Sequence, residues 1–328
     1  MKKIIIYILI SVIAFGTGYY LKPTAELTDV INTDINTQLI EKNDTVFDPD
    51  NMEASPFVWN GELKYFIAER NDAENFYQLA IFDFKTRKRI ATFGEGLGLG
   101  AATVIDDTLY VTATEDWFNF GNSKVYLFTS KDLKTFSDPQ LILEASENQK
   151  IFNTSLTKNS ETGQLVLSYE YQDDVTVPFS IKFLVSNDGK NWQKFDSNPF
   201  GPDVYVACPF LKYLDGYYYM VFLMEDFNDP NCPTCLSYVA KIARSQDLIS
   251  WTTSPRAFLT ADRKNEGINN SDIDMTEFEN KTVIFYAAAD QVTWAEIKYA
   301  YFNGTMKTLF ESFFLNTNPN ITVEEIES

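Results

Sequence analysis

Three short stretches decide the fold: Ser130-Lys131-Asp132-Leu133-Lys134-Thr135-Phe136, Ser186-Asn187-Asp188-Gly189-Lys190-Asn191-Trp192 and Ser245-Gln246-Asp247-Leu248-Ile249-Ser250-Trp251. All three fit the pattern Ser-x-Asp-[Leu/Gly]-x-x-[Phe/Trp], and they recur about every 56 to 59 residues. A strand-turn-strand signature that repeats at such a period is typical of repeat architectures, most often propellers. We expect the closing aromatic residues to pack under their turns.

Tight turns between strand-like runs mark five units. They stand at Asn60-Gly61, Asp106-Asp107, Ser160-Glu161-Thr162-Gly163, Asp215-Gly216 and Glu279-Asn280. Gly, Asn and Asp tolerate positive φ, which short hairpins require. The sequence therefore predicts an all-β fold, a five-bladed β-propeller of four-stranded antiparallel blades over residues 47–314. The outer turn of unit one is expected near Asp83, and that of unit five at Asn303-Gly304-Thr305.

Charge and composition exclude several classes of function. A net charge of −19 argues against a nucleic-acid partner, because a phosphate backbone requires a basic surface. The sequence contains no His, which removes Ser-His-Asp and Cys-His catalysis and the commonest zinc sites. Acid–base chemistry must therefore use Asp, Glu, Tyr or Lys. We expect a monomer.

Three cysteines are present, Cys208, Cys232 and Cys235. The last two form a C-x-x-C pattern in an all-β context, which favours a local disulfide in an oxidising compartment over a redox motif. Cys208 is expected either as a small buried hydrophobic residue or as a partner of one of the other two.

The two ends of the chain differ from its centre. Lys2 and Lys3 precede an uncharged, mostly apolar run over residues 4–21, which is typical of an export signal, either cleaved or kept as a membrane anchor. Residues 22–46 are expected to be a polar linker, and residues 315–328 a flexible tail. We therefore expect an exported protein, extracellular or periplasmic, that contacts a membrane only through its N-terminal segment.

The repeated units resemble the five-bladed β-propeller glycosidases of the arabinanase, levansucrase and invertase superfamily, over roughly residues 47–314. The last two units are also similar to a bacterial glycoside-hydrolase-like group. That likeness rests on Ala207-Cys208-Pro209-Phe210, Asp215-Gly216-Tyr217-Tyr218, residues 243–248, Asn269-Asn270-Ser271-Asp272-Ile273-Asp274, residues 301–305 and residues 310–314. The resemblance implies a glycosidase that works with Asp and Glu side chains.

The sequence departs from the superfamily's catalytic pattern. The resemblance implies an Asp at the start of blade one, a second Asp in blade three and a general-acid Glu at the start of blade four. In this chain the nearest blade-one carboxylate is Glu53, the blade-three place is Asn153, and the blade-four place before Pro209 is Ala207. The usual catalytic triad therefore does not carry over intact.

Acidic residues nevertheless stand at or near the end of the second strand of every unit, where a propeller's central funnel opens. They are Glu69, Glu115, Glu170, Glu225 and Asp290. Acids of the first strands, Glu53, Asp203, Asp272 and Asp274, are expected at the same rim. Crowded carboxyls push their pKa values apart, which supplies the protonated and ionised pair that glycoside hydrolysis needs. The catalytic candidates are Glu225 first, as general acid, then Asp272 and Asp274, and also Glu170 and Glu53.

Other residues are candidates for sugar binding. Asp272, Asp274 and Asn270 alternate along one strand and are expected on one face. Arg70 is expected either to bind an acidic sugar or to form an ion pair with Glu69 or a neighbouring residue. Aromatic rings in rim loops can stack on sugars. The full set of binding candidates is Arg70, Glu69, Glu115, Trp117, Asn153, Asp203, Asn270, Asp290 and Trp294.

Two functions fit these residues. The first is an exported glycoside hydrolase acting on an oligo- or polysaccharide. The second is a carbohydrate-binding propeller that has lost the catalytic triad. The strand-end acids favour the hydrolase, and Ala207 and Asn153 favour the binding protein. No organic cofactor is expected, and the carboxylates suggest a structural Ca²⁺ in the channel as an option.

Overall fold

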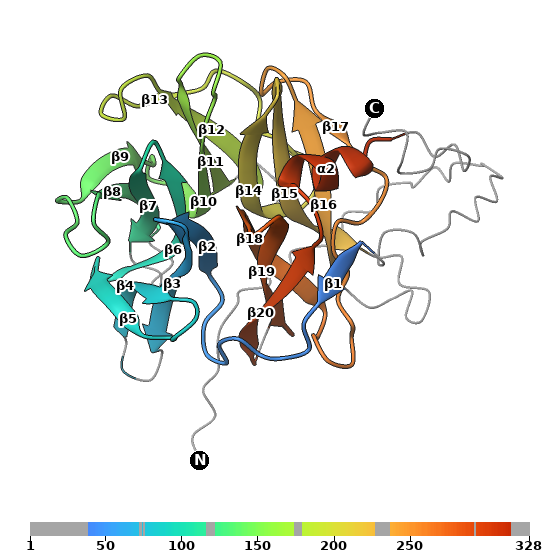
Figure 1. The fold of residues 1–328 in the computed structure, drawn as a ribbon. Helices are drawn as coiled ribbons and strands as arrows, with labels where there is room; N and C mark the ends of the chain where they lie inside the picture. The colour runs from blue at the N-terminus through green and yellow to red at the C-terminus, as the bar shows by residue number, and fades with distance from the viewer. Residues whose placement is uncertain are drawn as a thin grey trace.

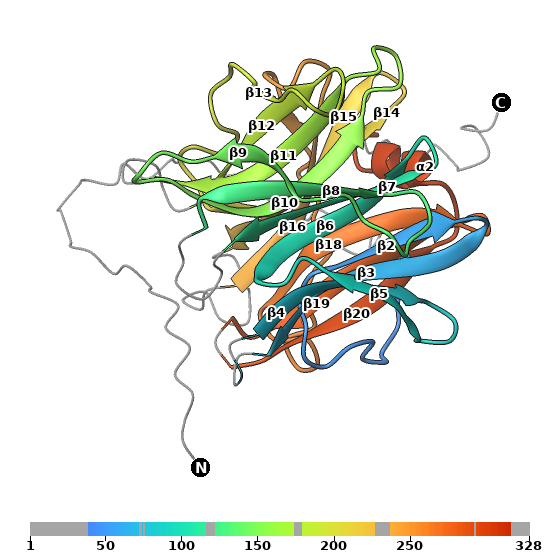
Figure 2. The same cartoon turned by 90° about the vertical axis from the view of Figure 1, so that its left-hand side faces the viewer.

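The computed structural model describes residues 39–71, 74, 76–115, 122–173, 179–226, 237–291 and 293–315. These residues form five four-stranded antiparallel sheets arranged around a central axis (Figures 1 and 2). The prediction of an all-β, five-bladed β-propeller is therefore confirmed. Each sheet presents one strand to the axis and pairs the other three outward.

The first four blades follow the chain in order. From the axis outward they are β2 (Ala54–Trp59), β3 (Glu62–Asn71), β4 (Phe76–Asp83) and β5 (Arg89–Phe93); β6 (Leu97–Ile105), β7 (Thr108–Glu115), β8 (Lys124–Ser130) and β9 (Gln140–Glu144); β10 (Lys150–Lys158), β11 (Leu165–Gln172), β12 (Ser180–Ser186) and β13 (Gln193–Lys194); and β14 (Val206–Leu214), β15 (Tyr217–Asp226), β16 (Ser237–Ser245) and β17 (Thr252–Thr253). In Figure 2 the sheet β6–β9 lies between its two neighbours.

Blade five is closed by the beginning of the described chain. It consists of β18 (Asn269–Phe278), β19 (Lys281–Ala289) and β20 (Ala295–Phe302), with β1 (Ile40–Lys42) as its outer strand beside β20 (Figure 1). Residues 40–42 thus belong to the propeller, although the sequence pattern assigned them to the linker. Pairing between the two ends of a chain leaves no residue pattern in either segment alone, so neither segment indicates it.

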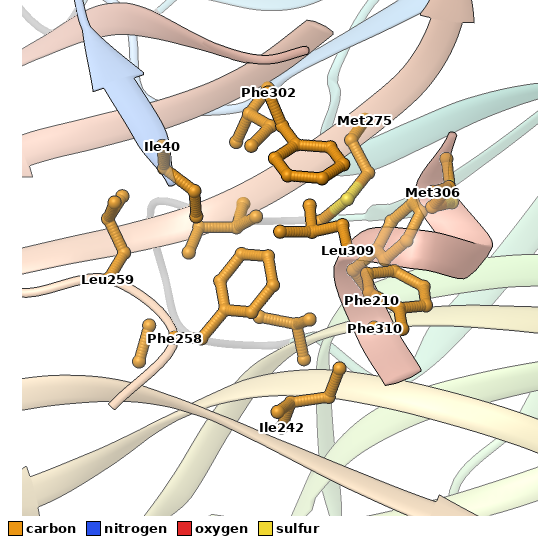
Figure 3. Close-up of a cluster of buried hydrophobic side chains, with 14 of the residues drawn as sticks. Ile40, Phe210, Ile242, Phe258, Leu259, Met275, Phe302, Met306, Leu309 and Phe310 are labelled. Carbon is orange, nitrogen blue, oxygen red and sulfur yellow. The ribbon is translucent and has the colours of Figure 1, made fainter. Parts of the chain in front are cut away.

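A helix stands where unit five was expected to continue with a fourth strand. The turn at Gly304 is followed by α2 (Met306–Ser312), whose N-cap Thr305 accepts a hydrogen bond from the Thr308 N–H. Its apolar face, Met306, Leu309 and Phe310, packs between blades four and five, against β1, β14, β16 and β18 (Figure 3). The helix therefore fills the gap between these two blades.

The Ser-x-Asp turns hold their shape through a repeated set of hydrogen bonds. In the third copy the Ser245 Oγ accepts from the Leu248 N–H at 2.9 Å, and Asp247 Oδ1 accepts from the N–H groups of Ile249 and Ser250 at 2.9 and 2.7 Å. These donors lower the pKa of Asp247 to about 2. The fourth position has positive φ in all three copies, at Leu133, Gly189 and Leu248.

The closing aromatics pack as expected. Phe136 stacks on Phe93 with ring centroids 3.6 Å apart, and Trp251 stacks on Phe183 at 5.7 Å. The Trp192 indole N–H donates to the Gly189 carbonyl at 3.2 Å. The repeated aromatic residue is thus a packing element of each outer turn.

The axial strands carry the feature that shapes the site. β6, β10, β14 and β18 each contain a β-bulge near their first residues, between Gly98 and Ala101, Ile151 and Thr154, Ala207 and Phe210, and Ser271 and Asp274. Leu99, Cys208 and Asp272 have positive φ at these bulges. A bulge redirects side chains and is frequent next to functional sites.

Candidate functional site

A small cavity lies on the axis at the level of the bulges. It measures about 30 Å³ and is lined by the first residues of all five axial strands: Glu53, Ala54, Ser55, Gly100, Ala101, Asn153, Thr154, Cys208, Pro209, Asp272, Ile273 and Asp274. This volume is about that of one or two water molecules. Four of the predicted site residues, Glu53, Asn153, Asp272 and Asp274, therefore meet here.

Glu170 approaches this cavity from the second strand of blade three. Its side chain is 3% exposed. One carboxyl oxygen, Oε2, accepts from the Cys208 backbone N–H at 2.9 Å and from Asn153 Nδ2 at 3.1 Å. Burial, aided by the negative charge of Asp272, raises the pKa of Glu170 to about 8 against these two donors. Glu170 is thus protonated at neutral pH.

Asp272 is the second carboxyl of the pair. The bulge at this residue, with φ of 49°, turns its side chain toward the axis. Its Oδ2 accepts from the Ser271 hydroxyl at 2.6 Å, and the Cys208 thiol is also a hydrogen-bonding neighbour. Burial raises the pKa of Asp272, while Ser271, Cys208 and the charge of Arg70 oppose that rise.

Cys208 joins the two carboxyls. Its N–H binds Glu170, and its Sγ contacts both Asp272 and the Asn153 amide, the latter at 3.4 Å. Burial, with the charges of Asp272 and Glu170, raises the pKa of the thiol well above its usual range. The thiol is therefore a neutral donor. Cys232 and Cys235 lie outside the described residues.

Asp274 lies deeper in the channel. It accepts hydrogen bonds from the Ser55 hydroxyl and from the Met275 N–H, the latter at 2.8 Å, and Ser55 Oγ accepts in turn from the Ala102 N–H at 3.0 Å. These bonds link blades five, one and two around the axis. Burial raises the pKa of Asp274 to about 7.

The expected alternation of Asn270, Asp272 and Asp274 on one face is wrong. The bulge between Ser271 and Asp274 breaks the two-residue period of β18. Asn270 is buried away from the cavity and accepts from Lys42 Nζ of β1 at 2.8 Å. It therefore helps to hold the closing strand.

The remaining strand-end acids do not join the cavity. Glu69 binds Arg89 at 2.5 and 2.7 Å and Gln78 at 2.6 Å, so the alternative ion pair between Glu69 and Arg70 is not formed. Glu115 contacts Lys124 at 3.1 Å. Asp290 caps a turn by accepting from the Thr293 N–H at 2.7 Å. These three acids thus serve contacts within their own blades.

Glu225 and the other candidates lie apart from the lining. Glu225 is half-buried at the end of β15, and burial raises its pKa. Asp203 is exposed before β14, and Trp294 is 40% exposed after the turn that Asp290 caps. Trp117 lies outside the described residues.

Tyr205 belongs to the site, although the sequence did not indicate it. Its ring lies next to those of Phe179 and Tyr238, each at a centroid distance of 5.3 Å. Its pKa is raised by burial and by interaction with the ionisable groups of Cys208, Glu170 and Asp272, so the phenol lies close to the whole cluster. A tyrosine one residue before a strand carries no signal of its own. The meeting of the blades brings it to the site.

No metal centre or membrane helix emerges from the described part of the chain. Within it, no group of three or more Asp, Glu, Cys or His side chains is placed to hold a metal ion. The structural Ca²⁺ that the carboxylates suggest stays a prediction.

No helix in the described ranges is long and apolar enough to cross a bilayer. The apolar run at residues 4–21 falls outside them.

Comparison with known proteins places the fold. No protein-family model and no curated protein matches the sequence. Solved structures do match. One is BT0996 in a complex with RGII, with a TM-score of 0.60 and 12% identity over 84% of this chain and 94% of that one. Another is an exo-1,5-α-L-arabinanase from a bovine ruminal metagenomic library, with a TM-score of 0.55 and 13% identity over 80% of this chain and 96% of that one.

A third match is a GH43_1 enzyme of Xanthomonas citri complexed with xylose, with a TM-score of 0.54 and 10% identity over 82% of this chain and 92% of that one. The structural neighbours are five-bladed β-propeller glycoside hydrolases. The resemblance seen in the sequence is thus confirmed at the level of fold. The chain is a five-bladed propeller whose fold is similar to that of these glycoside hydrolases, with the carboxyls of Glu170 and Asp272 at its axis.

Proposed function

We propose that the chain is an exported glycoside hydrolase acting on an oligo- or polysaccharide, with Glu170 as the proton donor and Asp272 as the base or nucleophile. One observation carries the proposal. A buried carboxyl from β11, Glu170, and a half-buried carboxyl from β18, Asp272, meet through Cys208 at an axial cavity. Hydrolysis of a glycosidic bond needs such a pair with opposite protonation.

Burial raises the pKa of both carboxyls, but their surroundings support the ionised form to different extents. Asp272 has the Arg70 charge and the donors Ser271 and Cys208 to support its ionised form. Its negative charge then raises the pKa of Glu170. Crowded carboxyls titrate apart in this way in many active sites. The proposed mechanism uses Glu170 in its protonated form and Asp272 in its ionised form, which Arg70, Ser271 and Cys208 support against the effect of burial.

This pair differs from the arrangement that the family resemblance implies. The blade-four place of the usual general acid is Ala207, which is buried, and the blade-three place is Asn153. Here Asn153 donates to Glu170, and the residue after Ala207 does so through its backbone. Residues at or next to the places of the family's usual acids thus donate hydrogen bonds to Glu170, whose carboxyl reaches the axis from β11.

The size of the cavity indicates where a sugar would lie. About 30 Å³ accommodates a water or a hydroxyl group and not a sugar ring. The ring would therefore rest above the cavity, beside Tyr205 and Tyr238, with the exposed Trp294 as an outer stacking surface. Arg70 would face its hydroxyl or carboxylate groups.

The first test is reducing-sugar release by the purified full chain across plant, algal and microbial polysaccharides and aryl-glycosides. Glu170→Gln and Asp272→Asn should each reduce release by about 10²–10⁴-fold, the usual contribution of a general acid or base. Glu225→Gln is the matched control, because Glu225 ends the second strand of the next blade. Release that survives Glu170→Gln and disappears in Glu225→Gln would move the acid to Glu225.

The hydrogen bonds of Glu170 favour a second function, non-catalytic carbohydrate binding. Cys208 N–H and Asn153 Nδ2 both donate to the same oxygen, Oε2, so this carboxyl already has partners within the protein. Folded protein that releases no sugar from any substrate, but binds an oligosaccharide in calorimetry, would establish this function. The charged start and apolar run at residues 2–21 support export in either case.

A further inference from the structure

A second, larger cavity occupies the channel on the hairpin side of the site. It measures about 210 Å³ and is lined by the axial strands of all five blades, from Pro56 of β2 to Thr276 of β18. Its charged lining residues are Lys212 and Asp274. Since a dry cavity of about 150 Å³ can bind benzene, this volume suffices for a small organic molecule.

Lys212 presents an amine to this cavity without a partner. In the described ranges no group lies within hydrogen-bonding or ion-pairing distance of its Nζ; Asp274 and Glu277, both on β18, act on it only through their charge. The other lysines with similar burial differ in this respect. Lys241 Nζ donates to the Pro255 carbonyl at 2.8 Å, and Lys182 Nζ lies 3.7 Å from the Tyr171 ring centroid.

Placement in the channel favours the neutral forms of both charged groups. Burial lowers the pKa of Lys212 and raises that of Asp274 to about 7. A half-buried amine and a half-buried carboxyl that form no ion pair avoid the cost of two partly desolvated charges by exchanging a proton. An unprotonated lysine is a nucleophile toward carbonyl compounds.

We propose that this cavity is a carbonyl-binding site in which Lys212 forms a Schiff base with a small aldehyde and Asp274 supplies the proton. The Nζ lone pair attacks the carbonyl carbon, and the carbonyl oxygen takes a proton from Asp274 to give a carbinolamine. The amine nitrogen then loses a proton to the Asp274 carboxylate, and the same carboxyl protonates the hydroxyl, which leaves as water. The resulting iminium ion loses its N–H proton to Asp274, which gives the imine and restores the carboxyl. The balance is one amine and one aldehyde giving one imine and one water, with no oxidant or reductant.

The open-chain forms of reducing sugars and other short hydroxyaldehydes belong to the ligand class. Hydroxyl groups on such a ligand have partners in the lining, since Thr103, Ser155 and Thr276 contribute to the wall. The site does not depend on the proposed hydrolase function. Asp274 lines both cavities, so the two sites adjoin.

The test uses the full wild-type chain with glycolaldehyde as the probe and cyanoborohydride to reduce any imine to a stable amine. Peptide mapping by mass spectrometry gives the initial rate at each lysine. At pH 7 an ordinary exposed lysine is unprotonated in only about 0.04% of molecules, and each unit by which the pKa is lower gives about ten times more free amine. We expect Lys212 to be labelled at least about 10-fold faster than exposed lysines, and faster than Lys241 and Lys182.

Two further measurements make the result decisive. In urea all lysines should react alike, because the cavity is gone. Between pH 6 and pH 9 the rate at Lys212 relative to exposed lysines should fall, as Asp274 loses its proton and the exposed amines gain free base. Labelling of Lys212 no faster than of Lys241 and Lys182, or a preference that persists in urea, would overturn the proposal. Lys212→Met confirms the assigned peptide by losing its label.

Discussion

Replacing Glu170 with Gln should change the pH dependence of folding stability by one proton. The pKa of Glu170 rises from 4.5 to about 8 in the folded protein, chiefly through burial. The folded state therefore holds this proton more tightly than the unfolded state. The resulting stabilisation is complete below about pH 4.5 and disappears as pH rises through about 8. At about 1.4 kcal/mol per pH unit, the free energy of unfolding falls by about 5 kcal/mol over this range.

Gln is a suitable replacement because its carbonyl oxygen can accept both bonds that Glu170 Oε2 now accepts. Its amide cannot titrate. The assay is urea unfolding of wild type and Glu170→Gln, followed by tryptophan fluorescence at pH 5, 6, 7 and 8. We expect the stability of the wild type relative to the variant to fall by about 1.4 kcal/mol for each pH unit. Equal slopes of unfolding against urea in both proteins would show that the comparison is valid.

Glu225→Gln provides the control, because this carboxyl ends the equivalent strand of the next blade but is only half-buried. Its difference from wild type should vary much less with pH. Parallel stability curves for wild type and Glu170→Gln would refute the reasoning. They would mean that Glu170 is ionised in the folded protein at neutral pH, and the proposed proton donor would be lost with it.

Three other predictions concern the fold, each checked by urea unfolding. Lys42→Met should lower the free energy of unfolding by about 2–4 kcal/mol, because it leaves the buried carboxylate of Glu266, now 2.5 Å from Lys42 Nζ, without its counter-charge; no loss would show that β1 does not need this contact. Leu309→Ala should cost about 2–5 kcal/mol, since this side chain of α2 is fully buried between two blades, and a loss below about 1 kcal/mol would contradict the packing. Asp247→Ala should cost about 1 kcal/mol through two lost backbone hydrogen bonds, whereas an unchanged midpoint would argue that the turn holds without them.

The turns of the fold could be predicted from the sequence because their conformations depend on residues that are close together in the chain. Asn60-Gly61 and Asp215-Gly216 adopt the positive φ values that their residue types favour. Ser245 and Asp247 bind N–H groups two to three residues further along the chain. Such interactions recur wherever the same short pattern recurs, so the number of blades and the places of their tight turns could be predicted.

The site was less predictable because bulges and neighbouring blades decide it. Glu170 and Glu225 both lie near the end of a second strand, yet Glu170 lies opposite the bulge of β10 and binds an N–H of the next blade, at Cys208. Glu225 lies beyond the bulge of β14 and apart from the cavity. Asp272 reaches the axis because its backbone has positive φ, which no rule for Asp in a strand anticipates. Tyr205 joins the cluster through contacts with two different blades.

The sequence by itself thus determined the all-β repeat, its turns, the absence of His chemistry and the set of acidic candidates. The tertiary structure alone decided which two carboxyls meet, that β1 is the outer strand of blade five, and that α2 packs between blades four and five. It also decided that Lys212 faces a cavity with no ion-pair partner in the described ranges. The physical reason is the distance along the chain over which each kind of interaction acts. Turn conformation and strand periodicity arise within a few residues, whereas desolvation and charge coupling depend on groups that folding brings from distant parts of the chain.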